Sequence, residues 1–129
     1  MSPRSVVIDT NFLLLPFQFH IDILREMRYL MDFSHRYVIS SRTIRELKKV
    51  GRRTGKNGMA ARLALKLIEA NKASIDIVES DEMVDDWIVD YARKHRAIVC
   101  TNDSELRQRL RALRVKTVTM KAKSKLGFV

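Results

Sequence analysis

Two apolar stretches of the sequence run directly into an acidic residue with polar neighbours. "SVVIDTN" (residues 5–11) reaches Asp9, and "AIVCTND" (residues 97–103) reaches Asp103. In an open α/β sheet, ligands bind beyond the carboxyl ends of the parallel strands. If both stretches are central parallel strands, the two carboxylates emerge at the same edge of the sheet and can share one site.

Helix capping is the alternative role for these acids, because Asp and Asn favour the N-cap position. Asn102, with Glu105 three residues later, also fits a capping box. Two apolar stretches that both end in Asp, with Thr and Asn beside it, favour a functional site over two separate caps.

Glu46 is a third candidate because it is the only acid between Asp32 and Glu69, within a basic stretch. It lies in the first turns of a helix that follows the predicted strand of residues 36–40, so it can point toward the same sheet edge. Thr43 and Glu46 also fit a capping box, which is the structural alternative.

A fourth acid comes from the doublet Asp85-Asp86 in the predicted helix of residues 81–95. At about 100° per residue, Asp85 borders the apolar face of this helix, whereas Asp86 points to water. Asp85 is therefore the favoured member of the pair. The alternative role is favourable negative charge near a helix N-terminus.

Four carboxylates at one sheet edge repel one another and acquire raised pKa values unless a cation lies among them. Oxygen ligands favour Mg²⁺ or Mn²⁺ over zinc, and the three histidines have no metal-ligand spacing. A divalent cation held by acids beside a basic surface suits hydrolysis of a phosphodiester bond.

The charge of the chain supports a polyanionic partner. Twenty-five Lys and Arg residues against 15 Asp and Glu give a formal net charge of +10. The bases concentrate in residues 42–56 and 104–129, and acids collect in residues 76–90. Nucleic acid is the first interpretation of such polarity, and a protein that merely happens to be basic is the alternative.

Short β-branched runs alternate with helix-period segments, which predicts an α/β fold with a mainly parallel sheet of about five strands. Expected strands cover residues 5–9, 36–40, 74–79, 97–101 and 116–120. Expected helices cover residues 20–33, 40–51, 59–71, 81–95 and 103–113. The glycine-rich, basic stretch of residues 51–58 is expected to be a mobile loop.

The pattern predicts one domain over residues 1–120 and a basic C-terminal tail over residues 121–129, which is expected to be loose apart from its apolar end. Cys100 is the single cysteine, so no internal disulfide is expected. No apolar run is long enough to span a bilayer and no signal-peptide pattern is present, so we expect a cytoplasmic protein without a membrane partner.

Taken together, these motifs resemble the PIN-domain nucleases over almost the whole chain. The similarity rests on "VVIDTNFLL", "SRTIREL", "VDDWIVDYA" and "IVCTNDSELRQRLR", in that order. It implies a three-layer α/β/α fold and a Mg²⁺- or Mn²⁺-dependent endoribonuclease. The implied catalytic acids are Asp9, Glu46, Asp85 and Asp103. Asp9, Asp85 and Asp103 would hold the metal, with Asn11, Thr101 and Asp86 in support.

Within this family the motifs look most similar to the branch that processes small-subunit ribosomal RNA precursors. VapC-type toxins, which would need an antitoxin partner, are the runner-up, and a non-cleaving RNA-binding assembly factor is a third hypothesis. A homodimer or a ribosome-assembly partner is also compatible with the resemblance. The predicted RNA-binding residues are Arg42, Arg45, Lys49, Arg52, Arg53, Lys56, Arg107, Arg109 and Arg111.

Overall fold

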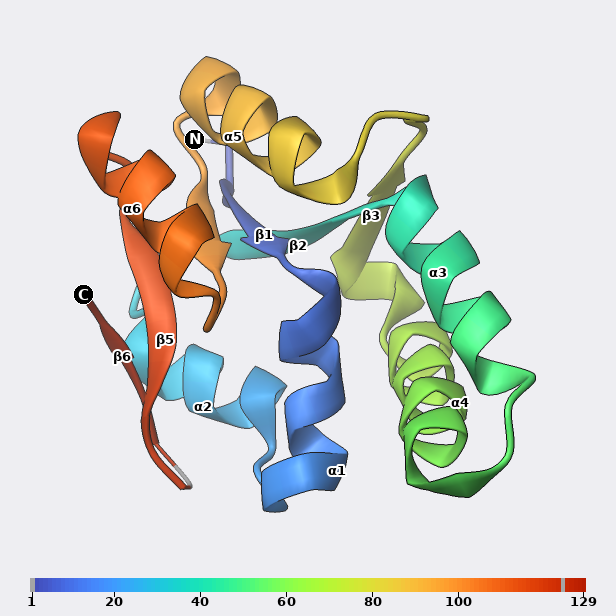
Figure 1. The fold of residues 1–129 in the computed structure, drawn as a ribbon. Helices are drawn as coiled ribbons and strands as arrows, with labels where there is room; N and C mark the ends of the chain where they lie inside the picture. The colour runs from blue at the N-terminus through green and yellow to red at the C-terminus, as the bar shows by residue number, and fades with distance from the viewer. Residues whose placement is uncertain (1, 124) are drawn as a thin grey trace.

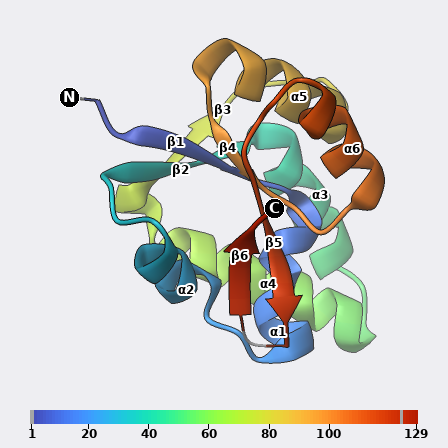
Figure 2. The ribbon, with the colours of Figure 1, turned by 90° about the vertical axis from the view of Figure 1, so that its left-hand side faces the viewer.

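The central β-sheet has six strands in the spatial order β3-β2-β1-β4-β5-β6 (Figures 1 and 2). The strands are β1 (Arg4–Ile8), β2 (His35–Ser40), β3 (Ile75–Val78), β4 (Ile98–Cys100), β5 (Thr117–Ala122) and β6 (Lys125–Phe128). β1 to β5 are parallel, and β6 pairs antiparallel with β5. The computed structural model describes residues 2–123 and 125–129. The predicted mainly parallel sheet is confirmed, with one strand more than expected.

Helices cover both faces of this sheet. They are η1 (Thr10–Leu14, 3-10), α1 (Leu15–Phe19), α2 (Ile23–Leu30), α3 (Ser41–Gly51), α4 (Gly55–Ala70), η2 (Lys72–Ser74, 3-10), α5 (Val84–His95) and α6 (Ser104–Ala112). Alternate residues of β1 point to opposite faces. Val6 and Ile8 pack with residues of η1, α1, α2 and α4, whereas Val7 packs with residues of α5 and α6. The fold is therefore the expected three-layer α/β/α sandwich.

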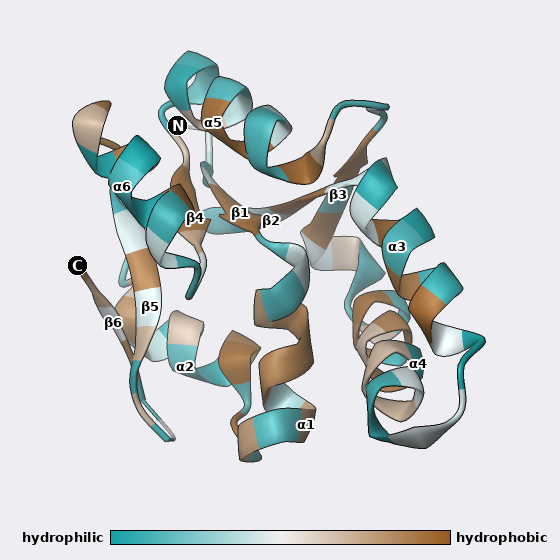
Figure 3. Ribbon diagram, in the orientation of Figure 1, coloured by the Kyte–Doolittle hydropathy of each residue, from teal (hydrophilic) through white to brown (hydrophobic). Residues whose placement is uncertain are grey.

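Apolar side chains form the strands and the inner helix faces because both sides of a parallel sheet are buried. Figure 3 shows hydrophobic residues gathered on the strands and on α1, and hydrophilic residues over much of α3, α5 and α6. The largest fully buried side chains include Phe12, Leu47 and Ile88, one from each of three different helices. No helix in the described part of the chain combines the length and the apolar character needed to cross a membrane.

Residues 10–19 form η1 and α1, two helices that the sequence pattern did not predict. Each is five residues long, which is too short for a 3.6-residue periodicity to be recognised. Phe12, Leu13 and Leu15 from this segment are buried in the core. The chain therefore turns after Asp9 and then anchors the turn with apolar side chains.

The expected mobile loop of residues 51–58 is wrong, because α3 continues to Gly51 and α4 already begins at Gly55. Gly58 allows the close approach: a Cβ atom there would lie 2.0 Å from the carbonyl oxygen of Arg53. The guanidinium of Arg62 donates to the carbonyl oxygens of Gly51 and Arg53, at 2.8 and 3.0 Å. These contacts close the α3–α4 hairpin tightly.

In the predicted tail of residues 121–129, the basic part is more ordered than expected, because β5 continues to Ala122 and β6 begins at Lys125 at the edge of the sheet. Ser124 lies outside the described residues. Leu126 is buried and Phe128 packs against the same core, since the two residues alternate onto one face of the strand. The Lys116 ammonium lies 5.3 Å from the centre of the Phe128 ring.

Candidate active site

Asp9 follows β1 at the point where the strand order of the sheet changes direction. The chain proceeds from β1 to β2 and β3 on one side, and β4 and β5 lie on the other. Ile8 is in register with Cys100 of β4, and the Asp9 N–H donates to the Cys100 carbonyl at 3.1 Å. Asp9 therefore stands at the topological switch point, where ligands bind in open α/β sheets.

A hydrogen bond from Thr101 fixes the buried carboxylate of Asp9. Asp9 is only 5% exposed and Thr101 is fully buried. The Thr101 hydroxyl donates to Oδ2 of Asp9 at 2.9 Å and accepts the backbone N–H of Asp103 at 3.0 Å. The Asp9 side chain makes no cap hydrogen bond to η1, so capping does not explain this residue.

Burial raises the pKa of Asp9 from 3.8 to about 6. The hydrogen bond from Thr101 opposes this rise, and the charges of Asp85 and Asp103 add to it. The same charges that raise the pKa would attract a cation, because a cation beside Asp9 would favour its ionised form.

Glu46 projects from α3, which begins directly after β2. Ser40 caps this helix by accepting the N–H of Arg42, so the capping box suggested for Thr43 and Glu46 is wrong. Instead, the Thr10 hydroxyl lies 3.2 Å from Oε1 of Glu46 and 2.9 Å from the Thr43 hydroxyl. The two threonines hold Glu46 in the direction of η1.

Thr43 is a contact that sequence reasoning missed as part of the site. The sequence contained a signal for this contact, because Thr43 lies three residues before Glu46 and therefore on the same face of α3. Fully buried, Thr43 connects the hydroxyl network to the helix core.

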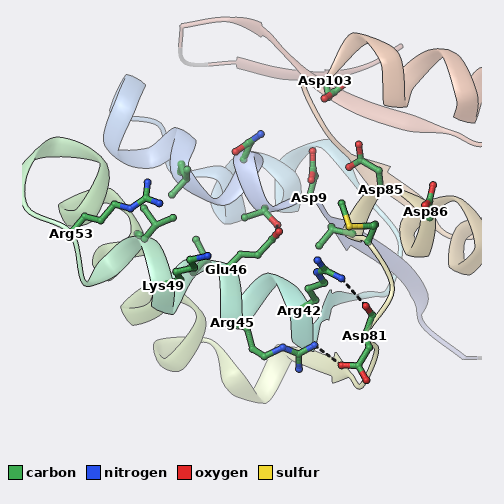
Figure 4. A pocket seen from close by; sticks show the side chains of 18 of the residues that line it. Asp9, Arg42, Arg45, Glu46, Lys49, Arg53, Asp81, Asp85, Asp86 and Asp103 are labelled. Carbon is green, nitrogen blue, oxygen red and sulfur yellow. Dashed lines mark hydrogen bonds and ion pairs between the residues drawn. The ribbon is translucent and has the colours of Figure 1, made fainter.

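Asp85 and Asp86 point in different directions from α5. Figure 4 shows the Asp85 carboxylate toward Asp9 and the Asp86 carboxylate turned away. Partial burial, and next the charge of Asp103, raise the pKa of Asp85 against the opposing effect of Arg109. Asp86 instead accepts a hydrogen bond from Arg109 at 3.0 Å. The helical geometry thus separates the doublet as its spacing predicted.

Asp103 caps α6 and faces the same cleft as the other acids. Its Oδ1 accepts the Leu106 N–H at 3.0 Å, and its remaining carboxylate oxygen makes no hydrogen bond to another described residue. The capping box proposed for Asn102 is wrong, because Asn102 Oδ1 accepts from Thr119 and from the Met120 N–H of β5. Capping and a functional role therefore coexist at Asp103.

An open cleft of about 1010 Å³ joins the four acids to a set of bases (Figure 4). Asp9, Glu46, Asp85 and Asp103 line it, together with Asn11 and Asp86. The predicted bases that also line it are Arg42, Arg45, Lys49, Arg53 and Arg109. Of the other predicted RNA-binding residues, Arg107 and Arg111 line a different cleft, and Arg52 and Lys56 are exposed at the turn between α3 and α4.

The arginines beside the four acids pair with other partners. Arg42 donates to the carbonyl of Asp81, and Arg45 pairs with the carboxylates of Asp81 and Glu79. In the part of the chain that the structure describes, no ion pair involves Asp9, Glu46, Asp85 or Asp103. Among the described residues, no direct ion pair therefore neutralises any of these four carboxylates.

This donor set fits a hard divalent cation in its chemistry, because every side chain offers carboxylate oxygens. As placed, no three His, Cys, Asp or Glu side chains of the described residues are close enough to hold a metal ion. Mg²⁺ does not require three, since it commonly keeps several waters and binds through one or two carboxylates plus substrate phosphates. The observation that supports a cation here is that the four carboxylates form no direct ion pair with a described residue.

Fold and site together define a class of protein. The family described as "PIN like domain" matches residues 6–123, a range that extends from within β1 through β5 and contains all four acids. The chain therefore belongs to the PIN-domain nuclease family.

Particular relatives are found in both branches that the sequence suggested. Ribonuclease VapC9 of Archaeoglobus fulgidus is 35% identical over 107 residues, which cover 82% of this chain and 75% of the relative. The rRNA-processing protein FCF1 of Saccharomyces cerevisiae is 31% identical over 113 residues, 86% of this chain. The match covers 56% of the yeast protein, so this chain spans little more than half of its length.

Solved structures agree with this assignment. The PIN domain endonuclease Utp24 superposes with a TM-score of 0.81 and 25% identity, over 98% of this chain and 91% of Utp24. A domain of a functionally unknown protein from Methanocaldococcus jannaschii has a TM-score of 0.65 at 19% identity, over 92% of both chains. The second likeness concerns the fold alone.

Proposed function

We propose that this protein is a metal-dependent endoribonuclease that hydrolyses phosphodiester bonds in single-stranded RNA. The observation that carries the proposal is the cleft at the β1–β4 switch point, which four acids line without a direct ion pair to any described residue. Membership of a nuclease family and the basic residues around the same cleft support it.

Asp9, Asp85 and Asp103 are the residues that would hold Mg²⁺ or Mn²⁺. When bound, such a cation lowers the pKa of a coordinated water and stabilises charge on the phosphate oxygens. Thr101 keeps one oxygen of Asp9 occupied, so the other oxygen is available to a ligand. Asn11 lines the cleft beside Asp9 and supplies a further polar group.

Glu46 acts on the attacking water or joins the ligand set. Its Oε1 accepts from Thr10, which leaves Oε2 to accept a hydrogen from a water molecule. As the water oxygen bonds to phosphorus it gives one proton to Glu46, the bond from phosphorus to the leaving oxygen breaks, and the leaving oxygen takes up a proton from solvent. Lys49 and Arg53 line the cleft without an ion pair among the described residues, so they are suited to hold the flanking phosphates.

Processing of ribosomal RNA precursors is the biological role that we favour. The resemblance to FCF1 and to Utp24 supports it, since the former is an rRNA-processing protein. A VapC-type toxin with an antitoxin partner is the second candidate, favoured by the 35% identity to VapC9. A homodimer, a ribosome-assembly partner and a cytoplasmic location remain predictions.

Cleavage assays with a matched acid variant test the proposal. Wild type, Asp9→Asn and the control Asp32→Asn are compared on single-stranded and duplex RNA, with Mg²⁺, with Mn²⁺ and with chelator. We expect metal-dependent cleavage of single strands by wild type and control, and none by Asp9→Asn. Tight RNA binding with no cleavage by any of the three proteins would instead support the non-cleaving assembly factor.

A further inference from the structure

A second basic cleft lies on the other side of α6 from the four acids. It has a volume of about 420 Å³, and its lining includes Arg107, Arg111, Arg114 and Lys116 together with Ser104 and Thr117. The lining also includes Val129, which carries the terminal carboxylate, but no Asp or Glu side chain of the described residues. Four cations therefore share one concave surface between α6 and β5.

The four bases of this second cleft are not neutralised by ion pairs with described residues. Among the residues that the structure describes, none of its four bases takes part in an ion pair. Lys116 lies over the Phe128 ring, a contact that keeps its positive charge. Like charges in a concave surface raise the local concentration of anions, so the cleft is suited to an anionic ligand.

Arg107 contributes to the second cleft through its charge. Its Nε is the one buried side-chain nitrogen or oxygen that lacks a hydrogen-bond partner within residues 2–123 and 125–129, so this atom is covered by the protein. Arg107 lines the second cleft, where its guanidinium charge adds to those of Arg111, Arg114 and Lys116.

α6 is the ridge that separates the two clefts. Asp103, its cap, lines the cleft of the acids, and Ser104, the next residue, lines the second cleft. Further along α6, Arg109 lines the cleft of the acids and Gln108 lines the second cleft. A polymer that leaves the acids across the first turn of α6 therefore enters the second cleft directly.

We propose that the second cleft binds the phosphodiester backbone of the same single-stranded RNA, beyond the point of cleavage. This inference rests on the proposed function, because it extends the path of the substrate from the acids over α6. The bases Arg107, Arg111, Arg114 and Lys116 hold phosphates, so recognition there is independent of base sequence.

The test uses the full chain with Arg114→Gly and Lys116→Gln combined. Arg114 has φ 58, in the left-handed region that glycine adopts readily, so this change removes a charge without loss of folding. The matched control combines Arg93→Gln and Lys94→Gln, which remove the same charge from the exposed end of α5, outside both clefts.

Binding is first measured with a single-stranded RNA short enough to occupy only the cleft of the four acids. It is then measured with the same RNA extended at its 5′ end, and with the same RNA extended at its 3′ end. We expect one extension to increase the affinity of wild type and of the control. The cleft variant loses this gain, and its salt dependence for the extended RNA falls by about 1.4 in log K per log salt, for two phosphates at about 0.7 each.

The inference is overturned if neither extension increases the affinity of wild type, or if the cleft variant keeps the gain. It is also overturned if the variant loses its binding of inorganic phosphate but keeps the full affinity for the extended RNA, because the cleft would then hold a free anion only. Cleavage is recorded on the same samples to separate the two proposals. If no RNA is cleaved but the cleft variant still loses the extension gain, the nuclease proposal fails and the second cleft stands.

Discussion

Thr101 and Asp9 are joined by a hydrogen bond of 2.9 Å across the ends of two adjacent parallel strands. The Thr101 oxygen also accepts the N–H of Asp103, so its single hydrogen is directed to Asp9. One buried hydroxyl thus sets the position of one acid and the backbone of another. Its removal therefore affects both.

We expect Thr101→Val to impair both chemistry and stability. The ionised form of Asp9 loses a donor, so its pKa rises further above about 6, and the acid limb of the pH profile of kcat/KM moves to higher pH. The unpaired groups reduce the free energy of unfolding by about 1–3 kcal/mol. Cleavage rates against pH and urea unfolding measure the two effects.

Thr101→Ser is the matched control for this prediction, because it keeps the hydroxyl and removes only a methyl group. Its pH profile should stay where that of wild type lies. If Thr101→Ser and Thr101→Val shift the acid limb equally, packing and not the hydrogen bond determines the effect.

Asp9→Asn should stabilise the metal-free protein at neutral pH. The folded-state pKa of about 6 lies above the ordinary 3.8, so the folded state binds this proton more tightly. The free energy of unfolding of wild type therefore falls as pH rises through this window. About two pKa units at 1.36 kcal/mol each give up to about 3 kcal/mol.

Urea unfolding in chelator, at several values between about pH 4 and pH 7, measures the Asp9→Asn effect. The variant should exceed wild type at pH 7 and approach it at pH 4, where both side chains are neutral. An equal gain at both ends of the range would show that Asp9 ionisation is not the cause.

Divalent cations should make wild type more stable than Asp9→Asn, the reverse of the order expected in chelator. Mg²⁺ or Mn²⁺ at 100 times its dissociation constant stabilises the folded protein that binds it by about 2.7 kcal/mol. We expect a rise in melting temperature for wild type and for Asp32→Asn, and none for Asp9→Asn. Sr²⁺, larger than either ion, and Na⁺ at equal ionic strength separate site binding from general screening.

Asp85→Asn and Asp86→Asn should differ strongly although the residues are neighbours. Loss of an outer partner of a metal ligand costs up to about 100-fold in activity or affinity, and we expect at least that loss for Asp85→Asn. Asp86→Asn frees Arg109 from its ion pair and should change kcat only slightly. Equal losses in single-turnover cleavage would contradict the assignment of Asp85.

Gly58→Ala should destabilise the α3–α4 hairpin. A Cβ atom at Gly58 would lie 2.0 Å from the Arg53 carbonyl oxygen, so the backbone must shift. Overpacking of this kind costs about 1–3 kcal/mol. Gly51→Ala is the milder comparison, because its Cβ would lie 3.3 Å from Cγ of Arg62 and 3.8 Å from the nearest backbone atom. Thermal unfolding should show a larger fall in melting temperature for Gly58→Ala than for Gly51→Ala.

The sequence predicted the sheet and the positions of the acids well, because strand runs and helix periodicity are local signals. The end of the apolar run at Asp9 and the helical position of Asp85 required no knowledge of the fold. The register of Ile8 with Cys100 could not be predicted, since it depends on pairing between residues far apart in the chain. The roles assigned to the acids stay predictions.

The wrong predictions have physical causes of their own. The basic, glycine-rich stretch before Met59 looked mobile, yet Gly58 permits close packing against the Arg53 carbonyl and Gly55 adopts a positive φ at the start of α4. The basic part of the C-terminal tail looked loose because of its lysines, but Lys121 and Ala122 extend β5 and Lys125 begins β6. In both cases a tertiary contact overrides the local composition.

The register of β1 with β4 makes the site a property of the whole sheet. Asp9 and Thr101 each come one residue after the paired Ile8 and Cys100, so the two side chains cannot separate unless the central ladder opens. Such ladders open only near the free energy of global unfolding. The contact between Asp9 and Thr101 is therefore lost together with the fold in a single cooperative event, whereas melting of α3, α5 or α6 would displace only the acid that the helix carries or that caps it.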